Sequence, residues 1–398
     1  MQGILRPVRN SSFDRGVSDG SARWRAAEFF AGIGLARVGM CQAGIDAVWS
    51  NDIAHTKRAM FDLQFGEDEA HTFVLRDLGQ VGRHELPQDI DLAWASFPCT
   101  DLSVAGGRAG LHKGLASSTF WHFIKVLSAL GESRPPVVAL ENVTAFATSH
   151  DGRDIGSAIR ALNGLGYSID VVKIDAIHFV PQSRPRLFLI GTMHHPAAVP
   201  VKADTAIRPN WLDKVFEDSA LLTHRMQLPD LPPALSEGLE RYLEDIPESD
   251  PRWWNSERVS AYVESLTDIQ SERFESLRRQ EVTHHRTAYR RMRQGVPRWE
   301  MRSDGVSGCL RTSSGGSSKQ AVVVLGKGRA KIRWMTPREY ASLMGVPEFP
   351  LNGVASHHAY CGFGDAVCAP VVAWLAEHYL VPLLQASRQP DVLDAVAG

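Results

Sequence analysis

The sequence predicts an α/β fold, built from alternating strands and helices, with a smaller domain inserted into it. Short apolar runs alternate with helical patterns between residues 25 and 191. The first apolar run leads through a glycine turn, Ala31-Gly32-Ile33-Gly34, directly into a helical pattern, and nucleotide-binding α/β folds begin in this way. The alternation is lost between residues 196 and 330, where we place the insertion.

The predicted elements follow in order along the chain. Before the insertion, strands are expected over residues 25–30, 46–50, 72–75, 90–95, 136–140, 167–177 and 187–191. Helices are expected over residues 31–42, 118–131 and 154–165. Near the end of the insertion we expect a strand at 321–325. A helix follows from Thr336-Pro337 to about Gly345, and a last helix opens at Gly362 and runs through Tyr379.

The length of 398 residues is enough for two domains, or for one domain with a large insertion, and a hydrophobic content of 44% fits a globular protein. We expect a main domain at 23–195 and 331–385, an inserted domain at 196–330, and tails at 1–22 and 386–398. The five cysteines form no Cys-x-x-Cys pair, and the paired histidines lack metal-ligand spacing, so no metal is expected. The odd cysteine count and the lack of a signal-peptide pattern favour the cytoplasm. No apolar run approaches the length of a membrane span.

The charge is unevenly distributed, although the formal net charge is only −2. Residues 273–333 hold 12 Arg and 3 Lys against 4 acidic residues, a net charge of +11. Residues 212–250 hold 10 acidic residues against 3 basic ones, a net charge of −7. This asymmetry is typical of a surface built for a polyanion, but two solvated faces of different charge would read the same way.

Cys99 is the candidate nucleophile. The apolar run at 90–95 ends at Pro98, whose fixed φ stops a strand, and Cys99 follows at once. Four glycines between residues 106 and 114 then suit a mobile loop. A thiol at the tip of a strand under such a loop is placed for covalent catalysis, and the alternative is a buried structural cysteine.

The glycine turn predicts a cofactor site, but not a dinucleotide site. In Phe30-x-Gly32-x-Gly34 the third glycine of the dinucleotide fingerprint is replaced by Arg37, which disfavours a dehydrogenase. The form suits a cofactor with an adenosine and no pyrophosphate. Asp52 ends the next strand and could bind ribose hydroxyls, or it could cap the following helix.

Two further motifs carry charge at strand ends. Glu141 follows a buried strand, where it could act as an acid or bond a base edge, or could be a solvated acid. Arg184 and Arg186 stand at i and i+2 before another strand. On an extended chain they would point the same way, to clamp a substrate or to face solvent.

Together these stretches resemble the cytosine-5 DNA methyltransferase family. The similar motifs are, in order, Phe30-x-Gly32-x-Gly34, Phe97-Pro98-Cys99, Glu141-Asn142-Val143, Gln182-x-Arg184-x-Arg186, Arg333 to Gly345, and Gly362 to Val367. The order matches from residue 26 to about 385. Two positions depart from the family pattern: Thr100 stands where Gln is usual, and Asp365 stands where Asn is usual.

The resemblance implies a Rossmann-like, class I S-adenosylmethionine-dependent methyltransferase fold, with 196–330 as a target-recognition domain. It implies transfer of a methyl group from S-adenosyl-L-methionine to carbon 5 of an extruded cytosine. The implied catalytic residues are Cys99, Glu141, Arg184 and Arg186. The implied cofactor contacts are Phe30, Gly32, Ile33, Gly34, Leu35, Asp52, Ile53, Asp77, Leu78, Pro98, Asp365 and Ala366. The expected DNA contacts are Ser103, Arg278, Arg279, Arg290, Arg291 and Arg293.

The expected partner is double-stranded DNA, with no membrane and no metal. We expect a monomer that protects host DNA in a restriction-modification or related phage-defence system, alone or with other defence proteins. Three alternatives remain open: the same chemistry on tRNA, a catalytically inactive relative that binds DNA, and a binding module without a cofactor. The long insertion favours DNA, because it is large enough to read a duplex sequence, and the intact Cys99, Glu141 and Arg184 favour catalysis.

Overall fold

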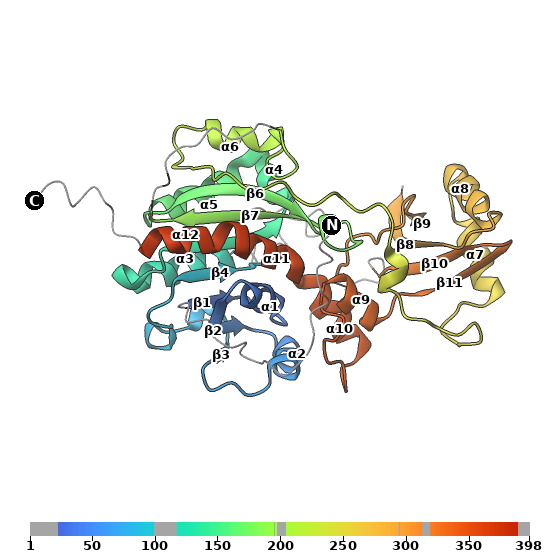
Figure 1. Ribbon diagram of the computed structural model, residues 1–398, viewed down its shortest axis with the longest axis horizontal. Coiled ribbons are helices and arrows are strands. Elements are labelled where there is room, and N and C mark those ends of the chain that lie inside the picture. Colours follow the sequence, from blue (N-terminus) through green and yellow to red (C-terminus); the bar gives the residue numbers. More distant parts are fainter. Residues whose placement is uncertain are drawn as a thin grey trace, which may run out of the picture. The chain divides into compact units, whose positions relative to one another are not determined.

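The computed structural model describes residues 23–98, 118–194, 196, 204–293, 295–312 and 319–388. They form two compact units, each with its own sheet (Figure 1). The seven-stranded unit comprises the described residues up to 174, residues 185–231, and those from 371 onward. The four-stranded unit comprises residues 175–184 and 232–370.

The sheet of the seven-stranded unit has the order β3-β2-β1-β4-β5-β7-β6. Strands β3, β2, β1, β4 and β5 are parallel, and β7 runs antiparallel to β5. The strands are β1 (Trp24–Phe29), β2 (Ile45–Asp52), β3 (Thr72–Leu75), β4 (Leu92–Ala95), β5 (Val137–Val143), β6 (Ser168–Asp175) and β7 (Pro185–Thr192). All seven strands predicted from the sequence before the insertion are present, with ends that differ by a few residues.

The direction of strand addition reverses at β1. The chain first builds outward from β1 to β2 and β3, then returns to place β4 on the other side of β1. Phe29 lies opposite Ala95 in this pairing, and the Ser96 amide donates a hydrogen bond to the Phe29 carbonyl at 3.3 Å. Ligand sites of α/β sheets form beyond the carboxyl ends of strands at such a reversal, so the loops after β1 and β4 are the expected site.

Helices α3 (Ser118–Leu130) and α5 (Arg153–Asn163) pack on one face of this sheet. Their buried apolar residues recur at spacings of three and four, and they join a core with residues of β1, β4 and β5. The other helical segments before β6 are α1 (Leu35–Gln42), α2 (His55–Phe65), η1 (Leu78–Gln80), η2 (Arg83–Glu85), η4 (Gly131–Ser133), α4 (Ala145–Thr148) and η5 (Ser149–Gly152).

A buried polar network attaches residues 204–231 and the C-terminal helices to β6. Asp170 is fully buried, pairs with Arg208, and accepts a hydrogen bond from the Tyr379 hydroxyl at 2.7 Å. His224 bonds both Ser168 and Tyr379 through its two ring nitrogens. The elements concerned are η7 (Asn210–Leu212), α6 (Asp213–Glu217), η9 (Ala376–Leu380) and α12 (Val381–Arg388). Part of the stretch predicted as an inserted domain therefore belongs to the seven-stranded unit.

The sheet of the four-stranded unit is antiparallel throughout, in the order β11-β10-β8-β9. Its strands are β8 (His284–Arg293), β9 (Val296–Met301), β10 (Ala321–Gly326) and β11 (Arg329–Trp334). Lys327 and Gly328, both with positive φ, form the two-residue turn between β10 and β11. Helices α7 (Ser256–Glu264) and α8 (Asp268–Arg278) pack on the sheet through Tyr262 and Phe274. The unit also holds η6 (Ala176–His178), η8 (Leu239–Tyr242), α9 (Pro337–Leu343) and α10 (Ser356–Asp365).

The helix predicted to open at Gly362 is placed differently in the structure. Residues Gly362–Asp365 end α10, and α11 (Ala369–Leu375) begins after a break. One helical stretch, Ser356–Arg388, is long and apolar enough to cross a membrane, but 67% of its most apolar window is buried, as in a core helix. The two units divide the chain differently from the predicted domains, because 331–370 also falls in the four-stranded unit.

Candidate functional site

Three of the predicted site motifs follow strands that are neighbours in the seven-stranded sheet. The glycine turn follows β1, Phe97-Pro98 follows β4, and Glu141 lies near the carboxyl end of β5. Since these strands are parallel, their carboxyl ends meet at one edge of the sheet. The structure therefore brings together the expected cofactor turn and the expected catalytic glutamate within one unit.

The two glycines of the turn have different tasks. Gly34 has φ +81, and a Cβ there would lie 2.3 Å from Phe65 Cε2, so this glycine lets α1 start against α2. Gly32 has φ +59, and a Cβ there would meet only Lys57, at 4.0 Å. The backbone at Gly32 is thus open to a ligand, while that at Gly34 is closed by the protein itself.

Asp52 supports the turn as well as the next helix. One carboxylate oxygen accepts a hydrogen bond from the Gly32 amide at 2.8 Å, and the other accepts one from the Ala54 amide at 2.8 Å. Each oxygen keeps a second lone pair, which leaves capacity for ribose hydroxyls. The sequence left capping and cofactor binding as alternatives for Asp52, and this geometry is compatible with both.

An apolar surface lies directly after Asp52. Ile53 is 64% exposed, which is unusual for isoleucine, whereas Ile33 and Leu35 of the turn are buried. A left-handed glycine turn, an acceptor carboxylate and an exposed apolar side chain fit an adenosine group: polar contacts for the ribose and apolar contact for the base. Ile33 and Leu35 are core residues here, so any cofactor contact they make is through the backbone.

The third predicted cofactor position follows β3. The Asp77 side chain accepts a hydrogen bond from the Gly79 amide at 2.8 Å and caps η1. Its side chain remains 44% exposed, with His122 Nδ1 at 3.6 Å, while Leu78 is buried. Asp77 is therefore accessible to a ligand, and Leu78 serves the core.

At the end of β4 the chain passes from the core to the surface. The Phe97 ring is buried against Phe120 and Phe146, and its carbonyl accepts a hydrogen bond from Asn142 Nδ2 at 3.3 Å. Pro98 is exposed. Cys99 and Ser103, the expected nucleophile and a DNA contact, lie outside the described residues.

Glu141 and Arg186 form a buried ion pair beside this strand end. Arg186 Nε lies 3.0 Å from Glu141 Oε1, and the two side chains are 14% and 8% exposed. The pairing register explains the contact: Glu141 lies opposite Phe188, and Arg186 is two residues away on the same face of β7. The antiparallel direction of β7 thus brings Arg186 to the carboxyl edge of β5.

Arg184 has different partners, contrary to the expectation that Arg184 and Arg186 act as one clamp. Its guanidinium group is 1% exposed and donates to the carbonyls of Leu310, Gly364 and Ala366 at 2.6, 2.9 and 2.5 Å. These carbonyls belong to the four-stranded unit, as does Arg184. The described contacts of Arg184 indicate a structural role, while Arg186 pairs with Glu141.

The comparison with known proteins decides the family. The profile of the family described as "C-5 cytosine-specific DNA methylase" matches residues 24–380. The chain belongs to this family. It is accordingly an enzyme of the DNA (cytosine-5-)-methyltransferase class, and its methyl donor is S-adenosyl-L-methionine.

Curated relatives agree with this family, and solved structures agree with its fold. Type II methyltransferase M.Bsp6I of Bacillus sp. (strain RFL6) is 24% identical over 364 residues, which cover 90% of this chain and 99% of the relative. The fold is similar to that of the Dnmt2 methyltransferase of S. pombe, with a TM-score of 0.54, 17% identity, and coverage of 92% and 100% of the two chains. The methyltransferase EhMeth of Entamoeba histolytica gives a TM-score of 0.56, 15% identity, and coverage of 93% and 100%. The predicted fold class is confirmed.

The motif at residues 362–367 lies in the four-stranded unit of this methylase. The Thr312 hydroxyl bonds the Asp365 carboxylate, and the Ala366 carbonyl accepts from Arg184. A Cβ at Gly364 would lie 2.5 Å from backbone atoms of Arg311 and Thr312, so only glycine fits there. Asp365 stands where asparagine is usual, and its side chain accepts the hydrogen bond of the Thr312 hydroxyl. A contact between Asp365 and the cofactor remains a prediction.

Several arginines predicted to meet DNA have partners within the methylase itself. Arg278 is paired with Glu275 at 2.7 Å and donates to the Gly328 carbonyl. Arg279 is 77% exposed, at 3.8 Å from Glu275. Arg291 lies 3.5 Å from Glu300, whereas Arg290 is exposed. Arg290 and Arg291 are neighbours on β8, so they point to opposite faces of the sheet.

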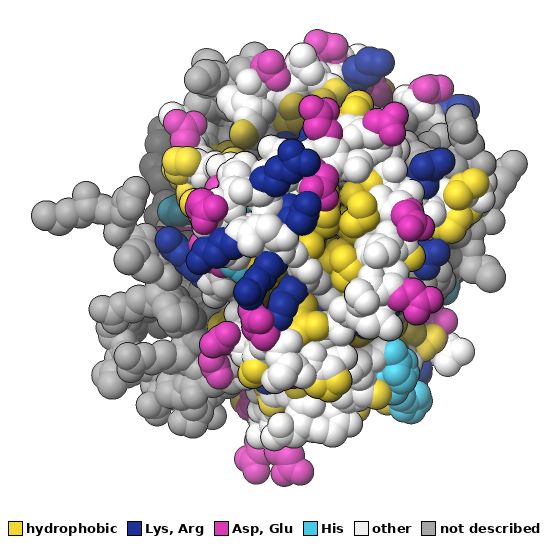
Figure 2. All heavy atoms as spheres, turned by 90° about the vertical axis from the view of Figure 1, so that its right-hand side faces the viewer, with side chains coloured by type: hydrophobic (Ala, Val, Ile, Leu, Met, Phe, Trp, Pro, Cys, Tyr) yellow, Lys and Arg dark blue, Asp and Glu magenta, His cyan; other side chains and the backbone are white. Residues whose placement is uncertain are grey.

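Figure 2 shows one face of the protein on which the charges are mixed: basic side chains gather near apolar ones, and acidic side chains stand among them. The four carboxylates within 273–333 include Glu275 and Glu300, which both pair with arginines. The net charge of this stretch therefore overstates the number of cations available to a polyanion.

A buried acid close to the glycine turn was missed by the sequence reasoning. Glu28 is 1% exposed, and burial raises its pKa to about 8, although Arg37 opposes this shift. Ser50 donates to Glu28 at 3.3 Å, and His71 contacts Ser50 at 2.9 Å. The sequence does contain a signal for this buried acid, because Glu28 lies inside the apolar run Ala26-Ala27-Glu28-Phe29. Within the described ranges, no group of three or more His, Cys, Asp and Glu side chains could hold a metal ion.

Proposed function

We propose that the chain methylates carbon 5 of a flipped cytosine in a specific duplex DNA sequence, through a covalent adduct with Cys99. We further propose that it works in the cytoplasm, in host-DNA protection of the restriction-modification or phage-defence kind. The observation that carries the proposal is the buried Glu141–Arg186 pair. Glu141 lies on β5, the neighbour of β4, and the exposed Pro98 that follows β4 directly precedes Cys99 in the sequence.

The residues of this chain would act in sequence on the base. The Cys99 thiolate adds to carbon 6, and the electron pair of the 5,6 double bond makes carbon 5 nucleophilic. Glu141 holds the ring nitrogen and exocyclic amine of the cytosine, with its orientation fixed by Arg186. After carbon 5 has been methylated, it loses its proton; that electron pair re-forms the double bond and expels the thiolate.

The extruded base must be withdrawn from the duplex, which costs roughly a few kcal/mol. A buried, oriented carboxylate offsets part of that cost, because it can form hydrogen bonds with the base edge without first reorganising. A solvated glutamate, the alternative left open by the sequence, would not supply this, and Glu141 is only 6% exposed.

The cofactor would be held at the glycine turn. The Gly32 backbone is open to it, Asp52 offers acceptors to the ribose, and Ile53 offers an apolar face to the adenine. Asp77 is accessible just after β3, the strand next to β2. When bound there, S-adenosyl-L-methionine supplies a methyl group from its sulfonium sulfur.

Duplex DNA is the substrate favoured over tRNA. The chain after β7 adds a unit with its own antiparallel sheet and helices α7 and α8, which is a structure large enough to read a duplex. The curated relative described above carries the name type II methyltransferase, which supports a role in host protection.

The test is a covalent trap. A duplex with 5-fluorocytosine has no carbon-5 proton to lose, so with methyl donor present the adduct to Cys99 should accumulate and survive denaturing electrophoresis. Cys99→Ser should form no adduct and transfer no tritiated methyl, while its thermal unfolding stays unchanged. Bisulfite sequencing of DNA from an expressing host then identifies the base and its sequence context. Methylation of tRNA but not of duplex DNA would overturn the choice of substrate, and full turnover by Cys99→Ser would overturn the mechanism.

A further inference from the structure

A groove of about 900 Å³ lies within the four-stranded unit, between the start of α7, the end of β11 and helices α9 and α10. Its walls combine the aromatic rings of Trp254, Trp334 and Tyr360 with the cations Arg258 and Lys319. None of these five residues was expected as a contact from the sequence. A groove with aromatic walls and basic side chains is typical of sites for phosphate-bearing ligands.

Two cations in the groove lie close to the same indole ring, that of Trp334. Arg258 Cζ lies 4.0 Å from the ring centroid of Trp254 and 5.4 Å from that of Trp334. Lys319 Nζ lies 5.3 Å from the Trp334 centroid and 4.2 Å from that of Tyr360. The aromatic faces hold both cations in place, which reduces the conformational entropy that a ligand would otherwise have to remove.

The two cations repel each other, and no carboxylate compensates them. Among the described residues, neither Arg258 nor Lys319 has an acidic partner within salt-bridge distance. Burial lowers the pKa of Lys319, and the positive charge of Arg258 lowers it further. Burial also lowers the pKa of Arg258. Two interacting like charges without an anion are a cost to the folded protein, and that cost is relieved when an anion binds.

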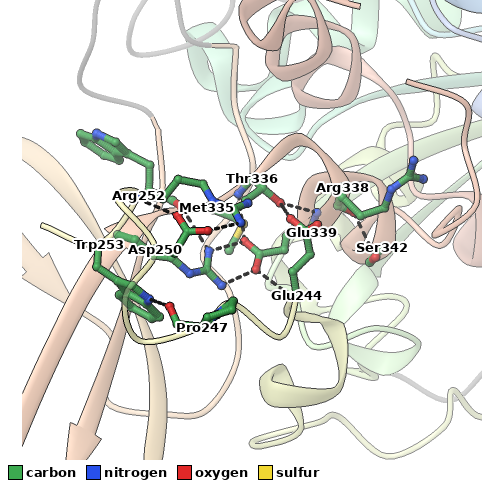
Figure 3. A network of polar contacts seen from close by, with 12 residues as sticks. Glu244, Pro247, Asp250, Arg252, Trp253, Met335, Thr336, Arg338, Glu339 and Ser342 are labelled. Carbon is green, nitrogen blue, oxygen red and sulfur yellow. Dashed lines mark hydrogen bonds and ion pairs between the residues drawn. The ribbon is translucent and has the colours of Figure 1, made fainter. Parts of the chain in front are cut away.

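The acidic residue of the groove is already engaged. Glu244 accepts a hydrogen bond from the Thr336 hydroxyl at 2.5 Å, and its amide donates to Glu339. Figure 3 shows Glu244, Thr336 and Glu339 pointing toward one another, within a network that also fixes the start of α9. Glu244 is therefore fixed as part of the wall and is not a counter-ion for Arg258 or Lys319.

We propose that Arg258 and Lys319 form an anion site over Trp334, which takes one backbone phosphate of the DNA duplex. The proposal rests on the proposed function, since it assigns part of the DNA contact to this groove. It differs from the sequence expectation in the residues that it names: Arg278 is bound to Glu275 and Gly328, whereas Arg258 and Lys319 are held apart from acids. A phosphate is the matching anion, because its several oxygens accept from a guanidinium and an ammonium group at once.

The first test is DNA binding as a function of salt, with the full-length protein and a duplex that lacks target sequences. Removing one phosphate contact should reduce the slope of log K against log salt by about 0.9. We expect Arg258→Gln/Lys319→Gln to bind about tenfold more weakly and to show this smaller slope. Arg258→Lys keeps the charge and should keep the slope. Arg241→Gln removes an arginine of the same unit that is 83% exposed and should leave affinity and slope unchanged.

The second test follows Lys319 directly. Its lowered pKa should make the amine of the free protein reactive toward an acylating reagent at pH 8, as read by mass spectrometry of the modified peptide. Duplex DNA should protect Lys319, and inorganic phosphate at equal ionic strength should protect it only at far higher concentration. Protection by inorganic phosphate but not by duplex would overturn the assignment to DNA.

The outcomes separate this proposal from the proposed function. If the double variant kept the wild-type slope and Lys319 stayed reactive in the presence of duplex, the site would be refuted, even if methyl transfer occurred. If the wild type bound duplex with the expected slope but formed no adduct with 5-fluorocytosine DNA, the site would stand and the proposed chemistry would fail.

Discussion

Arg186 Nε lies 3.0 Å from Glu141 Oε1, in an ion pair that is almost fully withdrawn from solvent. Burying two charges is costly, so such a pair is not evidence of stability by itself. Once both partners are buried, however, the removal of one leaves the other without compensation. The pair thus fixes a carboxylate at the carboxyl edge of the sheet, where we propose that methyl transfer takes place.

We expect Glu141→Gln to abolish most methyl transfer, because an amide can accept a hydrogen bond but cannot take up and release a proton as the carboxyl group does. The rate of a single turnover should fall by about 100-fold or more. Arg186 would lose its counter-ion, so the free energy of unfolding should also fall, by about 3 kcal/mol. Rates are therefore to be compared per folded molecule, with folding checked by urea titration. A Glu141→Gln enzyme with wild-type single-turnover rate would show that the carboxylate has no part in the reaction.

The matched substitutions Arg184→Lys and Arg186→Lys should differ in effect: the first should mainly lower stability, and the second should mainly lower the reaction rate. Arg184 donates to three carbonyls, and lysine cannot reproduce that planar geometry, so Arg184→Lys should cost about 2–3 kcal/mol of stability. Its rate per folded molecule should change by less than about tenfold, or 1.4 kcal/mol. Arg186→Lys should instead slow the reaction more than it destabilises the fold. Equal rate losses in both variants would support the clamp that the sequence predicted.

Much of the seven-stranded sheet could be predicted because its strands carry short apolar stretches, most of which are buried in the core. Thr72–Leu75 is a strand over the predicted residues, and the helix at 118–131 is α3 at Ser118–Leu130. The carboxyl-edge placement of the glycine turn and Glu141 also follows from the sequence, since each motif comes directly after such a run.

The partners of the charged residues could not be predicted, because they depend on contacts between distant parts of the chain. Arg184 finds its carbonyls 126 to 182 residues away, and Asp170 meets Arg208 and Tyr379. The spacing of residues along the sequence does not predict pairings over such distances. The net charge of residues 273–333 overestimated the cations available to DNA for the same reason, because Arg278 and Arg291 are paired with acidic residues in the fold.

Gly34→Ala should disrupt the start of α1 more than its backbone conformation alone explains. The left-handed conformation at φ +81 costs an alanine about 1–2 kcal/mol, and its Cβ would also overlap Phe65. Gly44→Ala is the control, because φ is +79 there and nothing lies within 4 Å of a Cβ. We expect Gly34→Ala to lower the free energy of unfolding by at least about 1 kcal/mol more than Gly44→Ala does, with the excess due to overpacking. If urea unfolding showed equal losses of stability in the two variants, α2 would be accommodating the added Cβ at no cost in free energy.

The final prediction concerns Glu28, whose carboxyl group is protonated in the fold at neutral pH. Burial raises its pKa from 4.5 to about 8, against the opposing charge of Arg37. Because the folded state holds this proton more tightly than the unfolded state, the associated stability is full below about pH 4.5. It is lost as the pH rises through 8. His71 has the opposite sign: burial lowers its pKa from 6.5 to about 3, so its contribution changes only below pH 6.5.

Between pH 6.5 and 8 the two effects separate, and Glu28 alone of this pair titrates. The free energy of unfolding of the wild type should fall relative to that of Glu28→Gln by about 1.4 kcal/mol per pH unit, since glutamine keeps a hydrogen-bonding partner for Ser50 but carries no proton to lose. Urea unfolding at pH 6.5, 7.0, 7.5 and 8.0 measures this difference. Glu69→Gln, which changes an exposed glutamate, should follow the wild type. Parallel pH profiles for the wild type and Glu28→Gln would mean that Glu28 is already ionised in the fold, with Arg37 outweighing its burial.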